Sequence, residues 1–167
     1  MGDARVGEAD LEDMTQARLD PGDLAELADA APECTLVFVD DDGWPGGVTM
    51  SHLFHEGRFW LTSVRGRAQV RAVERDERVG LVVSSAGSPL PGRRMVRVRG
   101  RAVVLDDRAT RDAILPLISA RLQPSDPDRM LALLDSPRRV LIRVDPVACP
   151  QSHDSRRVAG DGRGGAR

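Results

Sequence analysis

The sequence predicts an α+β fold, in which six antiparallel strands form a β-barrel and small helices lie at its periphery. Six short segments are rich in apolar and β-branched residues, as strands are. Turn-forming residues separate the first three of these segments from one another, which favours hairpins and antiparallel pairing. Closing such a sheet into a barrel removes the unpaired edges that it would otherwise expose.

The strand expected over residues 95–107 has the clearest pattern, because apolar and arginine residues alternate along it. Side chains of successive strand residues point to opposite faces. One face therefore carries Val96, Val98 and Ala102, and the other Arg97, Arg99 and Arg101. The remaining strands are expected over residues 34–40, 48–56, 58–63, 78–86 and 138–146.

Short helices account for most of the other segments. The first begins after the capping residue Asp20 and ends near Pro32. The second, over residues 66–77, places Val70 and Val73 three positions apart, the spacing of one helical face. The last two are expected over residues 108–122 and 126–136.

We expect one domain over residues 21–157, between two disordered ends. Residues 1–20 are acidic with few large apolar side chains, and residues 158–167 are rich in glycine and arginine. No apolar run approaches the roughly 20 residues that span a bilayer, and the N-terminus lacks the apolar core of a secretory signal. Cys34 and Cys149 are isolated thiols, which favours a reducing compartment. A cytoplasmic protein is therefore predicted.

Charge is distributed unevenly along the chain, although the net charge is only −2. Residues 1–33 carry ten acidic and two basic side chains, whereas residues 58–101 carry eleven arginines and three acidic side chains. All 24 basic side chains are arginine. A basic segment of this kind binds nucleic acid or phosphate groups, or meets an acidic surface.

A candidate phosphate site follows the strand over residues 58–63. Thr62 and Ser63 end this strand, and Arg65, Arg67 and Arg71 come next, with no acidic residue between them. Hydroxyl groups, arginine side chains and the first backbone N–H groups of a helix can converge there on a phosphate.

The alternative interpretation of these arginines is a solvent-exposed helix face with charges paired along the helix, such as Arg71 with Glu74. Arg75 and Arg78 have acidic neighbours and are assigned to this alternative.

The sequence contains no self-contained catalytic motif and predicts no metal site. His52 and His55 lie three apart on a strand and so point to opposite faces. An enzyme with this sequence would therefore depend on a cofactor for its chemistry. The arginines of residues 97–101 form a stripe that suits a nucleic-acid backbone, but no aromatic residue lies between them to stack on bases.

The order of these motifs resembles the pyridoxamine 5′-phosphate oxidase-like proteins, which have the FMN-binding split-barrel fold. The resemblance covers residues 24–157. It rests on DDGWP, GRFWLTSVRGRAQVRAVERDERVGLVV, VRVRGRAVVLDD, LDSPRRVLIRVDP and SHDSRR, in that order. It implies a six-stranded split barrel that forms a homodimer. The resemblance also implies that FMN, or alternatively the deazaflavin coenzyme F(420), lies between the subunits.

The resemblance implies a set of cofactor-binding residues. The phosphate-binding stretch corresponds to residues 61–71, and the late SHDSRR segment is expected to close over the cofactor. The residues implied are Leu61, Thr62, Ser63, Arg65, Arg67, Gln69, Arg71, Ser152, Asp154 and Arg157.

Two departures from the family pattern bear on function. Gln69 stands where the family often has lysine, which removes one positive charge from the phosphate site. The chain also shows no sign of the substrate-binding C-terminal region of the true oxidase, so the vitamin B6 reaction is not expected.

The resemblance thus implies an oxidoreductase that transfers a hydride between a flavin-type ring and a small unsaturated substrate. The alternative is a split-barrel protein that binds a cofactor or haem without catalysis. A third hypothesis is nucleic-acid binding.

Overall fold

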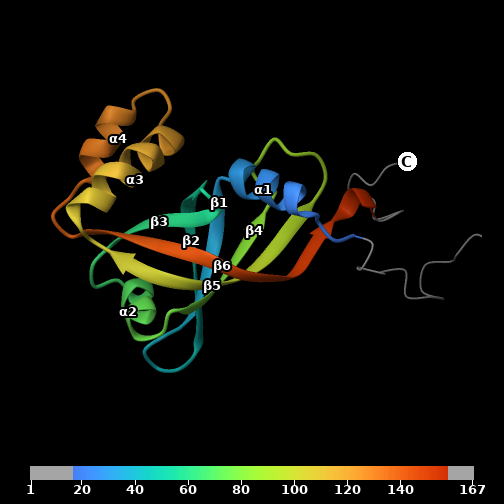
Figure 1. Ribbon diagram of the computed structural model, residues 1–167, viewed down its shortest axis with the longest axis horizontal. Helices are drawn as coiled ribbons and strands as arrows, with labels where there is room; N and C mark the ends of the chain where they lie inside the picture. The colour runs from blue at the N-terminus through green and yellow to red at the C-terminus, as the bar shows by residue number, and fades with distance from the viewer. Residues whose placement is uncertain (1–16, 158–167) are drawn as a thin grey trace, which may run out of the picture.

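The computed structural model describes residues 17–157, and it confirms the α+β fold predicted from the sequence (Figure 1). In the described residues, six strands form one closed antiparallel barrel in the order β1-β2-β3-β6-β5-β4. The strands are β1 (Glu33–Val39), β2 (Pro45–His55), β3 (Arg58–Val64), β4 (Arg78–Ser84), β5 (Arg94–Leu105) and β6 (Arg139–Asp154).

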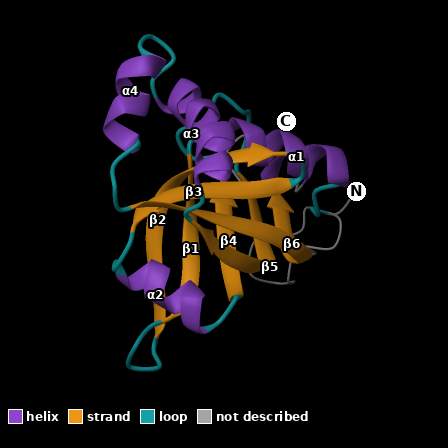
Figure 2. Ribbon diagram, turned by 60° about the vertical axis from the view of Figure 1, so that its left-hand side comes forward, coloured by secondary structure: helices purple, strands orange, loops and turns teal. Residues whose placement is uncertain are grey.

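The helices lie outside the barrel (Figure 2). They are α1 (Pro21–Ala30), α2 (Ala68–Arg75), α3 (Arg108–Leu122), α4 (Pro127–Leu134) and the short 3₁₀ helix η1 (Ser155–Arg157). Aspartate side chains cap three of them: Asp20, Asp107 and Asp126 each accept a hydrogen bond from a backbone N–H of the first turn. None of the helices in residues 17–157 is long and apolar enough to cross a bilayer.

The barrel interior forms the main core. Leu36, Leu61, Leu81 and Ile142 are fully buried there, and α1 adds Leu27. The alternation predicted for β5 is confirmed, since Val96, Val98 and Ala102 are buried. A smaller core around Leu115 and Trp60 lies between α3 and the barrel.

Strand β6 is longer than predicted. It continues past Pro146 to Asp154, and it pairs with β5 along most of its 16 residues. The predicted strand ended at Pro146, and proline lacks the N–H group of a regular ladder. Pro146 lies opposite Gly100, where the β5–β6 register shifts, so the irregularity accommodates it.

The packed part of the chain begins before residue 21. Ala17 and Leu19 are buried, although both lie in the segment predicted to be disordered. The carbonyl of Ala17 accepts a hydrogen bond from the backbone N–H of Asp154 (2.8 Å). Residues 1–16 and 158–167, the rest of the predicted disordered ends, lie outside the described residues.

His52 lies buried between β2 and α1. Its Nε2 donates to the carbonyl of Ala28 (2.7 Å), which fixes the neutral tautomer. Its Nδ1 is buried with no partner among the described residues, so a second proton would have no acceptor. Burial lowers the pKa of His52, and this effect exceeds the opposing effect of the hydrogen bond to Ala28.

We therefore expect the protein to lose stability as the pH falls below about 6.5, the pKa of histidine in an unfolded chain. Below this pH, His52 binds a proton in the unfolded state but not in the folded state. This difference lowers the free energy of unfolding by up to about 1.4 kcal/mol per pH unit. Urea unfolding at pH 7.5 and 5.5 measures this loss, and His52→Gln should reduce it. An equal loss in the variant would assign the pH dependence to other groups.

Candidate functional site

The end of β3 and the start of α2 carry most of the residues predicted to bind a cofactor. Leu61 and Ser63 point into the protein and are buried, whereas Thr62 on the opposite face is half-buried. Gln69 is buried too, and its amide Nε2 donates to the hydroxyl of Ser63 (3.2 Å). Of these four, Thr62 alone presents its side chain on the outer face of the barrel.

Two of the three predicted phosphate-binding arginines are already paired with carboxylates. Arg65 contacts Glu74 (3.1 Å) and also Asp106. The guanidinium of Arg71 binds Asp41 through Nε (3.0 Å) and donates to the carbonyl of Gly66. Sequence neighbours do not reveal Asp41 or Asp106, since both lie more than 25 positions from the arginine they bind.

Asp41 lies in the turn between β1 and β2 and binds Arg75 as well as Arg71. Hydrogen bonds from Arg71 and Arg75 lower the pKa of Asp41, so its carboxylate stays charged at neutral pH. Arg75 also donates to the carbonyls of Val39 and Asp40. These arginines therefore attach α2 to the β1–β2 turn.

Arg67 differs from its neighbours. It is the N-cap residue of α2, and its exposed side chain makes no hydrogen bond or ion pair within residues 17–157. The first turn of α2 contains no acidic residue, and no side chain caps it. The Val70 N–H already donates to the Arg67 carbonyl, so the backbone N–H groups of Ala68 and Gln69 and the Arg67 guanidinium are the donors that can bind an anion.

Arg139, at the start of β6, is a site residue that the sequence prediction missed. Its Nη1 lies 3.5 Å from Thr62 Oγ1 and 3.5 Å from the Ser63 carbonyl, the outer limit of a hydrogen bond. Burial, together with the positive charges of Arg67 and Arg111, lowers the pKa of Arg139. Within residues 17–157 no carboxylate forms an ion pair with it, and its Nε donates to the Leu134 carbonyl.

Thr62, Arg67, Arg139 and the N-terminus of α2 together form what we call the Arg67–Arg139 site. Repulsion between its two arginines is not relieved by any carboxylate that the structure describes. An anion with several acceptor oxygens, such as a phosphate, is the ligand that these donors suit. Gln69, which donates to Ser63, brings no charge to this site, and Arg139 supplies a positive charge from β6 instead.

The second predicted group, Ser152, Asp154 and Arg157, lies near the other end of β6 (Figure 1). Ser152 is twelve positions beyond Val140, the partner of Ser63 in β3, which corresponds to about 40 Å along the strand. The two predicted groups therefore do not come together within one chain.

This second group holds the start of the described chain in place. The Ser152 hydroxyl accepts from the Leu19 N–H (3.1 Å), and Arg157 donates to the Arg18 carbonyl (2.6 Å). Arg157 also pairs with Asp23 in α1. The side chains of Ser152 and Arg157 thus already form hydrogen bonds within the chain, which the sequence alone does not show.

Asp154 is completely buried and contacts Arg94 (3.8 Å) and Arg156 (2.5 Å). Burial alone would raise the pKa of Asp154, but hydrogen bonds from Arg156 and the nearby positive charges lower it overall. Arg94 is nearly as buried, and it binds Glu26 of α1. Asp154 thus stands in a buried ion cluster between β5, β6 and α1.

The sequence profile of the pyridoxamine 5′-phosphate oxidase family matches residues 22–151. No curated protein sequence matches the chain.

Several solved structures share this fold. Their sequence identity to this chain is low, so the likeness shows the fold alone. A conserved hypothetical protein, Rv2991 from Mycobacterium tuberculosis, aligns with a TM-score of 0.67 at 18% identity, over 85% of this chain and 89% of that one. An F(420) reductase aligns with a TM-score of 0.57 at 22% identity, covering 74% and 93%. A FAD-binding protein (mll6688) from Mesorhizobium loti aligns with a TM-score of 0.61 at 20% identity, covering 80% and 93%.

The family profile runs from the first turn of α1 to Gln151 of β6, three residues before that strand ends, and the strand order and the solved structures agree with it. The chain therefore belongs to the pyridoxamine 5′-phosphate oxidase family.

Proposed function

We propose that the protein is a homodimeric oxidoreductase that binds FMN or the deazaflavin coenzyme F(420), and that it transfers a hydride to or from a small unsaturated substrate. The observation that carries this proposal is the Arg67–Arg139 site, where Arg139 lies 3.5 Å from the Thr62 hydroxyl and the positive charge of Arg67 acts on Arg139, with no carboxylate partner for either arginine among the described residues. Family membership supports it, as does the likeness in fold to an F(420) reductase and a FAD-binding protein.

The residues present fit the phosphate of such a cofactor. Arg67 and Arg139 would bind its oxygens, Thr62 would add a hydroxyl, and the first N–H groups of α2 would complete the set. A bound phosphate would also remove the repulsion between the two guanidinium groups. The ring of the cofactor supplies the redox chemistry, and the chain supplies binding and orientation.

The dimer in this proposal accounts for the second predicted group. Ser152, Asp154 and Arg157 lie too far along β6 to meet a cofactor at the Arg67–Arg139 site of the same chain. Ser152 of a second copy, which is half-buried, and its exposed Arg157 would be free of that restriction, whereas Asp154 is completely buried in its ion cluster and would act by holding this segment in place. Analytical ultracentrifugation tests the dimer, and a monomer that binds the cofactor would remove these residues from the site.

We expect Arg67→Ala and Arg139→Ala each to weaken cofactor binding by about 1.5–3 kcal/mol, the contribution of a hydrogen bond to a charged group. Fluorescence titration of the purified protein with FMN and with the deazaflavin measures the affinity. Arg78→Ala is the matched control, because Arg78 is exposed, follows α2 and pairs with Asp76 instead. Binding of neither cofactor by the wild type would refute the proposal. Unchanged affinity in the two variants would refute the site.

A second candidate function is cofactor binding without catalysis. It is favoured by the neutral Gln69 bound to Ser63 and by the carboxylates paired with Arg65 and Arg71. The neutral Gln69 and the paired carboxylates leave the site with less positive charge than the sequence suggests. Bound cofactor that no electron donor reduces and no electron acceptor oxidises in a turnover assay would favour this second function over the first.

Nucleic-acid binding remains the third hypothesis, and the structure weakens its basis. Arg101 pairs with Glu77 and Arg97 is half-buried, so the stripe on β5 presents fewer free charges than its sequence suggests. A gel-shift assay at low salt, where phosphate-driven binding is strongest, tests it directly.

A further inference from the structure

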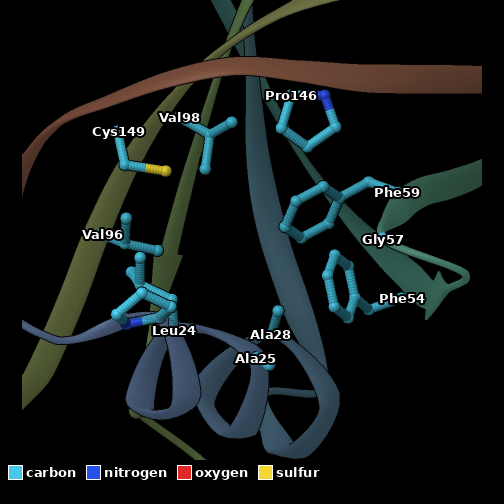
Figure 3. Close-up of a pocket in the computed structure, with 11 residues that line it drawn as sticks. Leu24, Ala25, Ala28, Phe54, Gly57, Phe59, Val96, Val98, Pro146 and Cys149 are labelled. Atoms are coloured by element: carbon cyan, nitrogen blue, oxygen red, sulfur yellow. The ribbon is translucent and has the colours of Figure 1, made fainter.

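A cavity of about 220 Å³ lies between α1 and the barrel (Figure 3). Side chains from α1, the β2–β3 hairpin, β5 and β6 converge on it. Its deeper wall consists of buried apolar residues: Ala28, Phe59, Val96 and Val98. Its mouth is formed by Ala25, Pro146 and Cys149, all of which are exposed. The cavity is therefore open to molecules from solution.

The lining determines what chemistry the cavity accepts. None of the residues that line it is charged, and the Cys149 thiol is the single polar side-chain group among them. A charged or strongly polar guest would lose its hydration without gaining a partner. An enclosed apolar cavity of about 150 Å³ binds benzene, so the volume of about 220 Å³ here has room for a substituted ring.

One wall of the cavity suits an aromatic guest in particular. The rings of Phe54 and Phe59 lie 4.9 Å apart at an angle of 52°. A third ring can continue such a tilted arrangement, which aromatic groups prefer to face-to-face stacking. Below these rings in the view of Figure 3, α1 presents the small side chains of Ala25 and Ala28. These side chains leave space that larger residues would fill.

We propose that this cavity is a binding site for one small, uncharged aromatic molecule, which enters past Ala25 and Cys149 and lies against Phe54 and Phe59. The cavity is separate from the Arg67–Arg139 site. None of its lining residues belongs to that site, and Pro146 lies seven positions beyond Arg139 on β6, about 23 Å along the strand. The proposal therefore does not depend on the cofactor.

Cys149 provides a reporter of occupancy, because its sulfur points toward the cavity (Figure 3). Partial burial raises the pKa of the Cys149 thiol, so labelling with iodoacetamide is best followed at alkaline pH. Cys34 does not interfere in the folded protein, since it is buried and burial raises its pKa to about 12. Mass spectrometry of the intact protein then follows a single modification.

Toluene and benzoate are the matched probes, since they share a ring and differ in charge. Toluene at several times its dissociation constant should slow the labelling of Cys149 at least roughly fivefold, as mass action requires when it excludes the reagent. Benzoate at the same concentration should leave the rate unchanged. A rate unaffected by toluene, or equal protection by benzoate, would overturn the proposal.

A variant at the mouth tests whether the guest occupies this cavity. Toluene should raise the melting temperature of the wild type, and Ala25→Phe should fill the mouth and abolish that rise. Melting is measured here because the new ring also shields Cys149. Ala113→Phe on α3 is the control, since Ala113 is exposed and does not line the cavity. A full response to toluene in Ala25→Phe would place the guest elsewhere and refute the site.

Discussion

Replacing Asp154 with alanine should destabilise the protein by about 3–5 kcal/mol, the usual loss when one partner of a buried ion pair is removed. Asp154 is completely buried, and its carboxylate lies among Arg94, Arg156 and Arg157. Without it, Arg94 remains buried with Glu26 as its one carboxylate partner among the described residues. Urea unfolding of the cofactor-free protein measures the loss and keeps it separate from any effect on binding.

Asp145→Ala is the matched control for Asp154. Asp145 also lies on β6 and also binds two arginines, Arg58 (3.0 Å) and Arg143 (3.1 Å). Its side chain is 39% exposed, so water screens these pairs and the loss should stay below about 1 kcal/mol. Equal losses in the two variants would mean that burial is not what makes the Asp154 cluster important.

The same cluster should also make the protein sensitive to acid. The pKa of Asp154 is lowered in the folded state, so its contribution to stability is complete above pH 4, near the pKa of an unfolded aspartate. That contribution disappears as the pH falls through the lowered pKa. The loss expected from His52 begins about two pH units higher, which separates the two effects.

Gly100→Ala is the second substitution with a large expected effect, a loss of about 3 kcal/mol. A Cβ at this position would lie 2.4 Å from Val144 Cγ1 and 3.1 Å from the Asp145 carbonyl oxygen. Val144 is fully buried and branched at Cβ, so it has little freedom to move aside. Thermal and urea unfolding measure the loss.

Gly80 on β4 provides the control for Gly100, because both glycines lie within barrel strands. A Cβ on Gly80 would meet Val37 Cβ at 3.5 Å and the Val98 carbonyl at 3.8 Å, which are ordinary contacts. Gly80→Ala should therefore change the free energy of unfolding by less than about 1 kcal/mol in either direction. Comparable losses at both positions would indicate a general need for glycine in the barrel rather than a steric clash.

Local patterns in the sequence predicted the elements of the fold well. The alternation along β5 and the capped start of α1 each depend on residues a few positions apart. The continuation of β6 beyond Pro146 depends instead on the pairing of β6 with β5. The proline makes this continuation hard to predict from the sequence. Elements were thus predictable where neighbouring residues decide them.

The candidate site was predictable only in part, because distant residues decide which of its charges are free. Thr62 and Arg67 stand where the sequence suggested a phosphate site. The pairing of Arg65 with Asp106, and of Arg71 with Asp41, depends on how the barrel closes. Arg139 reaches Thr62 because β6 pairs with β3, a contact between residues 77 positions apart.

The strand order has a consequence for synthesis on the ribosome. The last strand, β6, is inserted between β3 and β5, so both of these strands have an unpaired edge until the end of the chain emerges. Unpaired edges are templates for pairing with other chains. The nascent protein is therefore most exposed to aggregation late in translation, and chaperone binding matters most in that interval. Completion of the barrel also requires contacts between residues that are far apart in the sequence, which slows folding.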